Sequence, residues 1–575
     1  MNKSFFRHDF LCLAFMAATG ILTMPMTRRI GLALAFFIIW VVMCEPNMHA
    51  ADVAGEIYGV YNEAGLDSPA DVVAPGSNVL IFLGSFSVGP TVPQTSAGFP
   101  LVTTLAGVSV KATVSGVSVD AYVLGAQTQW VRAMLPSNTP IGDGQLAVTY
   151  NGRSSAPYRL TVRERAFWIY DGSSCGPTSF PSVPGFCVGR AVQNIDPAGI
   201  VSANSLALPA RPGQLVTLWG SGLGAASGNE GAGPIPDALQ IAGLRVLFGG
   251  QPARIIYSGR SGCCAGMDEI IFEVPSGIEG CKVPLWVRYS NDGASSNDVY
   301  LSVASGTGAC SDPHGLSEGE ARKLSEGNIK AAEIWAGPRP DGGGSLSAAF
   351  GTPSQTAVIP FGSCGNIWGG EGFPALTQTR PLFDAGAALN LYAPRGTFIA
   401  ARFENGFYDG SLDGVPESGE YQLDNGEGGP DVGPFQAKFS VPDSAFVWTN
   451  RGDLGGVNRD GLVITWNVAD ATAGHVTVVG NLAMDGETSG STVFTCAERA
   501  DKGSFRIPPS VLERAGVWSG QYNEFYLNVG FRAAKRLTIP GLDFAEFLVF
   551  GPGQSTLLDP ASIQPVEALT KKGPQ

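Results

Sequence analysis

The sequence predicts an all-β protein in which two similar β-sandwiches precede a further β-rich region of sandwich or jelly-roll type. Three observations support this. Glycine (77) and proline (40) make up about one residue in five, above the usual share of about 12%. Charged residues are only 15% of the chain, against about 25% in an ordinary domain. The first half of the chain also carries a tandem duplication of short β-rich segments separated by turn residues.

The composition excludes several classes of protein. The net charge of −14 provides no basic surface for nucleic acid. Four histidines are too few for a multi-histidine metal site. Long periodic stretches rich in Ala, Glu, Lys and Leu, which helical bundles and coiled coils require, are absent from the sequence. We therefore expect a turn-rich β protein with no nucleic-acid partner.

Residues 1–50 are predicted to be a signal peptide. The basic pair Arg28 and Arg29 precedes an apolar stretch of 15 residues that ends at Cys44, and the small residues Ala50 and Ala51 follow. A basic segment, an apolar segment and small residues at the cleavage point are typical of a secretory signal. The stretch is short for a membrane span, which needs about 20 residues.

The residues before this signal are interpreted as an over-extended start, with translation beginning at Met24 or Met26. The alternative is a two-span membrane anchor, because another apolar stretch runs from Phe10 to Met26. We favour the signal peptide. The mature chain is then secreted or located at the cell surface, and it meets the membrane only through its export signal.

The cysteines of the mature chain are predicted to form disulfides. An even number remains after residues 1–50 are removed, which is typical of exported proteins. Zinc is excluded because no C-x-x-C pair occurs and because thiolates are oxidised outside the cell. The remaining cysteines are Cys175, Cys187, Cys263, Cys264, Cys281, Cys310, Cys364 and Cys496.

Two cysteines in this set are adjacent. The Cα atoms of Cys263 and Cys264 are about 3.8 Å apart, whereas bridged residues usually lie about 5.5–6 Å apart. We therefore expect them to reach two separate partners, Cys281 and Cys310.

The other four cysteines are then assigned. Cys175 and Cys187 flank a Gly/Pro-rich loop and are expected to close it. Cys364 and Cys496 remain for each other.

The duplication consists of four pairs of matching segments at an offset of about 140 residues. Each copy has a strand, a Gly-rich corner, two further strands and an alternating terminal strand, as a sandwich of about 100 residues requires. Residues 72–82 match 209–219, 105–110 match 241–246, 129–136 match 269–275, and 152–162 match 293–303.

These segments resemble the IPT/TIG immunoglobulin-like domain. The second copy has the Gly-Ser-Gly-Leu-Gly corner at 220–224 and a hydrophobic strand that ends in Val-Pro at 272–275, before the final strand of the sandwich. The first copy replaces the corner with residues 83–86. The stretch CCAGMDEIIFEVP and the CSDP at 310–313 also resemble a family of large uncharacterised secreted proteins of soil bacteria. The resemblance covers most of the mature chain, implies tandem immunoglobulin-like sandwiches and implies no activity.

The chain divides by composition into several parts. A helical pattern covers Leu316–Trp335, where Ser317 and Glu320 form a predicted capping box. The predicted parts are a signal peptide (1–50), an immunoglobulin-like repeat (51–165), a second repeat with a disulfide-closed loop (166–310), a helical linker (311–344), a β-rich region of one or two units (345–555) and a flexible tail (556–575).

Nucleophilic catalysis has little support in the sequence. The mature chain contains only His314 and His475, which we interpret as a turn residue and the start of a strand. A G-x-S-x-G match occurs at 172–176, but prolines follow it, whereas a nucleophile elbow needs a helix there. We interpret the match as chance.

An acidic segment at 408–433 has three interpretations. Its Asp-Gly and Asn-Gly pairs are typical hairpin turns, which is the interpretation we favour. Alternatively, two of its carboxylates serve glycoside hydrolysis. In the third interpretation it binds calcium through Asp424 and Asp431, because the Gly-rich run between them permits tight wrapping of a cation. The acidic residues are Asp409, Asp413, Glu417, Glu420, Asp424, Glu427 and Asp431.

Aromatic residues suggest one surface contact. Trp448 and Trp466 lie in apolar strands and are predicted to be core residues, whereas Trp368 lies in a loop and is a candidate contact. We therefore predict a non-catalytic exported or cell-surface binding or spacer protein that contacts protein or polysaccharide, with no cofactor unless calcium binds. The alternative is a carbohydrate-active hydrolase with an acidic pair in the C-terminal half.

Overall fold

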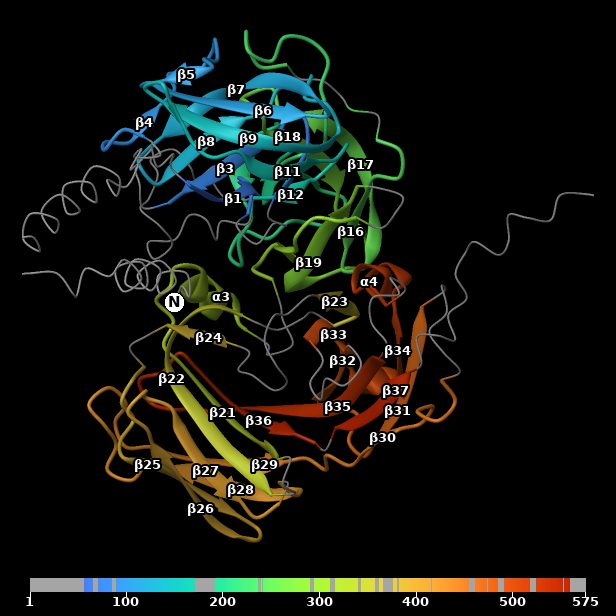
Figure 1. Ribbon diagram of the computed structural model, residues 1–575. Coiled ribbons are helices and arrows are strands. Elements are labelled where there is room, and N and C mark those ends of the chain that lie inside the picture. The colour runs from blue at the N-terminus through green and yellow to red at the C-terminus, as the bar shows by residue number, and fades with distance from the viewer. Residues whose placement is uncertain are drawn as a thin grey trace, which may run out of the picture.

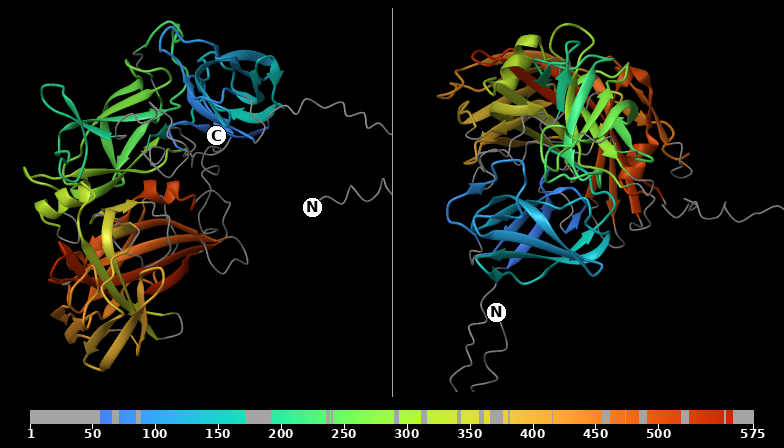
Figure 2. Two further views of the ribbon diagram at one scale, coloured as in Figure 1. Left: turned by 90° about the vertical axis from the view of Figure 1, so that its left-hand side faces the viewer. Right: turned by 90° about the horizontal axis from the view of Figure 1, so that it is seen from above.

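The computed structural model shows two β-sandwiches side by side and a larger C-terminal β region next to the second (Figures 1 and 2). Among the described residues, no helix is long and apolar enough to cross a membrane. The structure describes residues 56–558 apart from 66–70, 85–88, 171–191, 236–238, 240, 290–293, 311–315, 340–342, 357–360, 366–375, 380–381, 415, 455–460, 473, 484–490, 518–523 and 552.

The first sandwich is one sheet folded into two layers. Its long strand β7 joins the layers, because residues 117–121 pair with β6 and residues 122–126 pair with β8 across a bulge. The strands run in the order β1 (Ile57–Asn62), β3 (Asn78–Leu83), β8 (Trp130–Met134), β7 (Val117–Ala126), β6 (Val108–Val114), β9 (Gly142–Tyr150), β11 (Tyr158–Val162) and β2 (Val72–Val73), with β4 (Gln94–Thr95), β5 (Thr104–Leu105) and β10 (Arg153–Ser154) at the sides.

The second sandwich repeats this plan. Strand β17 joins its layers, pairing with β16 through residues 251–253 and with β18 through residues 254–260, again across a bulge. The strands run in the order β14 (Val201–Ala203), β13 (Val192–Ile195), β15 (Leu215–Ser221), β18 (Asp268–Glu273), β17 (Gln251–Arg260), β16 (Arg245–Phe248), β19 (Gly280–Arg288) and β20 (Val299–Val303), with β12 (Trp168–Ile169) beside β15.

The two sandwiches have the same strand order, as the duplication predicts. The series β3-β8-β7-β6-β9-β11 corresponds to β15-β18-β17-β16-β19-β20. A parallel contact at the edge is also repeated: Val72 pairs with Thr161 in the first sandwich, and Ala210 pairs with Val303 in the second. Alternating apolar residues from both layers fill a separate core in each sandwich.

Buried hydrogen bonds join the two sandwiches. The backbone N–H of Asn78 in β3 donates to Ser221 Oγ in β15 at 2.9 Å. The Asn62 amide group donates to the carbonyl oxygens of Ala166 and Ser221, at 2.9 and 2.8 Å. Because buried polar groups cost free energy when unpaired, these bonds hold the sandwiches in one orientation.

The C-terminal region contains one large mixed sheet and a small three-stranded sheet, β30 (Phe446–Trp448), β31 (Leu462–Val468) and β34 (Ser504–Ile507). The large sheet has the order β23 (Ser363–Gly365), β33 (Ser491–Arg499), β32 (Gly474–Ala483), β35 (Glu524–Arg536), β36 (Phe544–Phe550), β21 (Ala331–Pro338), β22 (Gly344–Thr356), β27 (Tyr408–Leu412), β26 (Gly396–Arg402), β25 (Ala388–Ala393), β28 (Gly419–Asp424) and β29 (Gln436–Val441), with β24 (Leu376–Thr379) and β37 (Gln554–Leu558) beside β22 and β35.

One end of this sheet curls back on its own middle. Phe439 of β29 lies 4.6 Å from Phe547 of β36 between ring centres, although six strands separate β29 from β36 in the sheet. Tyr421 of β28 packs against both rings. The sheet thus has an inner face that forms the core and an outer face on β25, β26 and β28.

The predicted helix over Leu316–Trp335 is only partly correct. Helix α3 covers Glu318–Ser325, and the capping box of Ser317 and Glu320 is present. The remainder is strand β21, which lies between β22 and β36. Gly327, at φ +70°, follows the end of the helix, and the apolar residues beyond it are buried in the sheet.

Candidate functional site

The structure corrects one set of predicted disulfides. Cys263 and Cys264 are bonded to each other in the turn between β17 and β18. The expectation that they reach Cys281 and Cys310 is therefore wrong. Pairing of β19 with β20 brings Cys281 and Cys310 together, with Cα atoms 5.0 Å apart. The usual Cα separation of bridged cysteines is a statistical preference, and here each of the two adjacent cysteines is the disulfide partner of the other.

The remaining disulfide predictions have separate outcomes. Cys364 and Cys496 are directly opposite each other on β23 and β33 and are bonded, as predicted. Cys175 and Cys187 lie outside the described residues, so their pairing stays a prediction.

Turn and strand contacts occupy several carboxylates of the acidic segment. Asp409 of β27 accepts a hydrogen bond from the Ser347 hydroxyl at 2.7 Å. Asp431 accepts one from the backbone N–H of Asp384 at 2.8 Å, which closes the β28–β29 connection against the segment before β25. Glu417 forms an ion pair with Arg395. The turn interpretation holds for Asn425-Gly426, where the Gly428 N–H donates to the Asn425 carbonyl at 3.1 Å. It is wrong for Asp409-Gly410, because both residues lie within β27 and pair with β22.

The two residues suggested for calcium belong to different contacts. Asp424 ends β28 and accepts hydrogen bonds from the Asn390 amide at 2.9 Å and from the backbone N–H of Gly426 at 3.1 Å. Asp431 binds the backbone of Asp384. Within the described parts of the chain, no group of three or more His, Cys, Asp or Glu side chains is placed to hold a metal.

A polar face with one central aromatic ring lies on β25, β26 and β28. Tyr392 is 40% exposed, and it lies opposite Thr397 on β26 and Gln422 on β28. The charge of the Asp424 carboxylate raises the pKa of the Tyr392 hydroxyl. The same carboxylate accepts the hydrogen bond of the Asn390 amide, so Asp424 interacts with both outward side chains.

Register explains why these side chains share a face. Side chains alternate between the two sides of a strand, and on β25 Leu389 and Leu391 face the core. Asn390 and Tyr392 consequently face outward, beside the outward Ile399 of β26, which is 59% exposed. We call Asn390, Tyr392, Thr397, Ile399, Gln422 and Asp424 the outer face.

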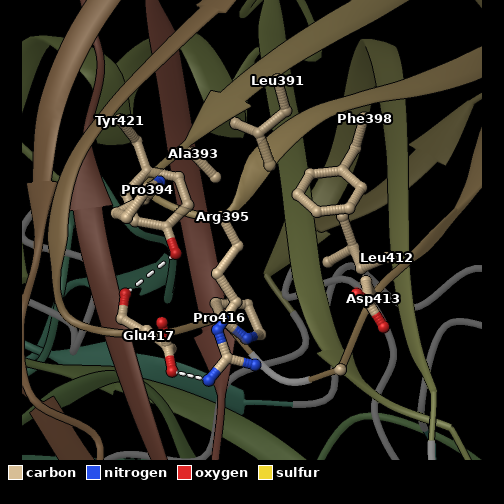
Figure 3. A pocket seen from close by; sticks show the side chains of 11 residues that line it. Leu391, Ala393, Pro394, Arg395, Phe398, Leu412, Asp413, Pro416, Glu417 and Tyr421 are labelled. Atoms are coloured by element: carbon tan, nitrogen blue, oxygen red, sulfur yellow. Dashed lines mark hydrogen bonds and ion pairs between the residues drawn. The ribbon is translucent and has the colours of Figure 1, made fainter.

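A small hollow lies at the end of this unit, where β25 turns into β26 (Figure 3). It contains about 310 Å³ of space, part of it open to solvent. Apolar side chains of the inner face, including Phe398 and Tyr421, form its floor, and Arg395, Asp413 and Glu417 line its mouth. The Tyr421 hydroxyl donates to the Glu417 carbonyl at 2.9 Å. Glu417 is ion-paired with Arg395 at this mouth.

A second, wider hollow lies at the opposite end of the same strands. Asp384, Arg402 and Glu404 line it together with the glycine-rich stretch 428–430. Arg402 lies 3.5 Å from Asp384, and Asp384 Oδ1 also accepts the backbone N–H of Gly386 at 2.8 Å. These contacts hold the connection between β24 and β25 in place.

Sequence reasoning missed one pair of buried carboxylates. Glu333 of β21 and Glu546 of β36 are directly adjacent in register and only 0% and 1% exposed. Neither residue lines either hollow. Both occur in apolar strands with no motif around them, and only the pairing of β21 with β36 reveals that they are neighbours.

The other candidate residues are distributed as follows. His475 is the second residue of β32, is 7% exposed and packs against the ring of Phe361. Trp448 and Trp466 are in the core, as predicted. His314, Trp368 and the 172–176 match lie outside the described residues.

Comparison with known proteins does not assign the chain to a family. No protein-family model matches it, and no curated protein matches it. The similar solved structures have TM-scores well under 0.5, so they do not indicate a function for this chain. They include the Bacteroides ovatus mixed-linkage glucan utilization locus SGBP-B in complex with a mixed-linkage heptasaccharide (11% identity, 77% of this chain, 93% of that chain, TM-score 0.16), the plexin A4 extracellular region (12%, 80%, 46%, 0.15) and domains 5–6 of the S-layer protein SbsC (14%, 44%, 100%, 0.13).

Proposed function

We propose that this chain is an exported, non-catalytic binding protein that holds a polysaccharide on the outer face of its C-terminal sheet. The chain is a multidomain β-sandwich protein that is cross-linked by disulfides. Disulfides persist in oxidising compartments, which supports export to the cell surface or beyond.

The proposal depends on Tyr392, Asp424 and Asn390, which lie together on an exposed sheet surface, where the Asn390 amide donates to Asp424 and the Asp424 charge acts on the Tyr392 hydroxyl. A sugar ring has an apolar C–H face and a rim of hydroxyls. An exposed tyrosine ring offers an apolar surface with a polar tip. An amide both donates hydrogen bonds to hydroxyls and accepts them, and a carboxylate accepts them. Because the hydrogen bond to Asp424 orients the Asn390 amide before any ligand arrives, little conformational entropy of that side chain is lost on binding.

The shape of the surface favours a chain over a single sugar. The outer face extends across β26, β25 and β28, and the nearby hollow opens at the end of these strands. An extended polysaccharide can contact several strands at once, so weak contacts add up. The net charge of −14 disfavours acidic polysaccharides.

The test compares Tyr392→Ala with Tyr58→Ala. Tyr58 is a matched control, since it is 64% exposed but lies on β1 of the first sandwich. The mature protein is screened against neutral polysaccharides, and affinity is measured by calorimetry. We expect Tyr392→Ala to weaken binding at least tenfold and Tyr58→Ala to leave it unchanged.

Three outcomes contradict the proposal. Equal binding by Tyr392→Ala and the wild-type chain removes the outer face as the site. A complete lack of polysaccharide binding removes the ligand class. Release of reducing sugar from a bound polysaccharide supports the glycoside hydrolase alternative instead.

Export has its own test. Sequencing the N-terminus of the protein recovered outside the cytoplasm is expected to give Ala51 or a close neighbour. A chain that retains its residues 10–26 contradicts the signal peptide and supports a membrane anchor.

A further inference from the structure

The adjacent cysteines Cys263 and Cys264 lie in the turn that connects β17 to β18. This turn is closed by the backbone N–H of Ser261, which donates to the Met267 carbonyl at 2.8 Å. The Ser261 hydroxyl lies 3.1 Å from the Cys263 sulfur and also accepts the Cys263 N–H. The disulfide is thus part of a compact turn, and this turn reaches the first sandwich.

Two carbonyl groups of the turn take part in the contact between the sandwiches, that of Ala265 directly and that of Gly266 through Ser221. The Ala265 carbonyl accepts the side-chain amide of Asn78, in β3 of the first sandwich, at 2.9 Å. The Gly266 carbonyl accepts the Ser221 hydroxyl at 2.9 Å. The same Ser221 oxygen accepts the Asn78 backbone N–H at 2.9 Å. Asn78, Ser221 and the turn therefore form one hydrogen-bonded junction.

The packing at this junction leaves no room for adjustment. Gly266 has φ +64°, and a Cβ at this position would lie 2.0 Å from Asn78 Oδ1 and 3.1 Å from Met134 of β8. The turn must hold its shape for its carbonyls to remain in place.

Solvent access distinguishes this disulfide from the two others described. Cys263 is exposed and Cys264 is half-buried. Cys281 and Cys310 are 3% and 2% exposed. Cys364 and Cys496 are both 0% exposed. Thiol–disulfide exchange requires that the attacking thiolate reach a sulfur atom, so Cys263 is the accessible target.

We infer that Cys263–Cys264 is a redox modification site that controls how tightly the two sandwiches are joined. A thiolate of a dithiol reductant attacks Cys263 Sγ, the Sγ–Sγ bond breaks, and Cys264 leaves as a thiolate. The second thiol of the reductant then displaces Cys263. Two electrons and two protons pass to the protein as two thiols, and the reductant becomes a disulfide.

The effect on the junction follows from covalent geometry. The disulfide closes an eight-membered ring that includes the peptide bond between the two cysteines. Breaking the ring frees the dihedral angles of both residues, and Ala265 and Gly266 follow directly in the chain. We expect the hydrogen bonds to Asn78 and Ser221 to open more often in the reduced protein.

The first experiment treats the full mature protein with increasing dithiothreitol and follows each cysteine by differential alkylation and mass spectrometry. Cys263 and Cys264 are expected to be reduced at a concentration at least tenfold below that needed for the two buried disulfides. The reduced pair is expected to capture phenylarsine oxide, which needs two neighbouring thiols. Simultaneous reduction of all disulfides, or reduction of the buried pairs first, overturns the inference.

The second experiment measures amide hydrogen exchange before and after that selective reduction. Peptides of β3 and β15 at the junction are expected to exchange at least tenfold faster once Cys263 and Cys264 are thiols, and peptides of β25 and β28 are expected not to change. Unchanged exchange at the junction overturns the inference even when reduction is selective.

Two variants separate the disulfide from the contact that it supports. Cys263→Ala/Cys264→Ala is expected to show fast junction exchange with or without reductant. Asn78→Ala removes the side-chain hydrogen bond to the Ala265 carbonyl and keeps the disulfide, so it is expected to exchange fast already when oxidised and to gain little on reduction. A large further increase in Asn78→Ala shows that reduction acts elsewhere and contradicts the proposed route.

Discussion

The guanidinium of Arg514 lies over the Trp286 ring, 5.3 Å from its centre, and this contact connects the C-terminal region to the second sandwich. Arg514 ends helix α4 (Pro509–Arg514), and Trp286 belongs to β19. Arg514 also forms an ion pair with Asp298. Trp286 shares one hydrophobic core with Leu512 of α4, so this joint combines apolar packing with a charged contact.

Replacing Arg514 is expected to weaken this joint. Arg514→Ala removes the cation over Trp286 and the ion-pair partner of Asp298, whose side chain is only 9% exposed. We expect the free energy of unfolding to fall by about 2 kcal/mol, measured by urea denaturation. Arg254→Ala is the control, because the Arg254 side chain is 71% exposed and such pairs contribute less than about 1 kcal/mol. Equal losses contradict this assignment.

Gly266 and Gly277 offer a matched pair of substitutions. Both have positive φ, but only Gly266 faces a neighbour that a Cβ would strike. Gly277→Ala is expected to cost about 1 kcal/mol from backbone conformation alone. Gly266→Ala is expected to cost at least about 2 kcal/mol, because Asn78 must also move. Thermal denaturation measures both, and a smaller loss for Gly266→Ala argues against close packing at the junction.

The buried Lys282 is expected to make the free energy of unfolding depend on pH. Burial lowers the pKa of Lys282 to about 8 in the folded chain, where its ammonium lies 4.4 Å from the centre of the Tyr300 ring. Between pH 8 and the ordinary lysine pKa of 10.5, the unfolded chain binds more protons at this site than the folded chain, so this residue makes stability rise with pH. Lys282→Met is expected to remove that increment and to stabilise the fold at pH 7 by about 2 kcal/mol.

Denaturation at pH 7 and pH 10 measures this effect as a difference between the variant and the wild-type chain. Lys282→Arg is the control, because it keeps the charge at both pH values. If the free energy of unfolding rises with pH as steeply in Lys282→Met as in the wild-type chain, other groups cause the rise and the assignment to Lys282 is wrong.

The two buried disulfides are expected to differ in the stability that they confer. Cys364–Cys496 spans 132 residues and Cys281–Cys310 spans 29. Constraint of the unfolded chain grows with loop length, so replacing the first pair by alanines is expected to cost about 1 kcal/mol more than replacing the second. Urea unfolding of both double variants checks this. The reverse order shows that local packing outweighs loop entropy.

Several features of the fold follow from local patterns. Alternation at residues 475–479 and 435–439 predicts strands that the structure contains as β32 and β29. Ser317 and Glu320 mark the start of α3 correctly. These predictions hold because alternation and capping depend on residues only a few positions apart.

The helical pattern over 316–335 fails for a related reason. Ala331–Pro338 carries no strong local preference, and its position between β22 and β36 makes it a strand. The candidate site shows the same limit. Tyr392, Asn390 and Asp424 become neighbours only because β25 pairs with β28 in one register.

The sequence alone determined the all-β class and the duplication of the two sandwiches, because composition and repetition are properties of the chain itself. The pairing of Cys364 with Cys496 was correct, but it was reached by elimination among pairs of which others were wrong. Tertiary structure decided that Cys263 bonds to Cys264 and that the β17–β18 turn lies against Asn78. It also decided which face of β25 stays open to solvent. These features depend on contacts between segments distant in the chain, whose partners and register are selected only when the whole molecule packs.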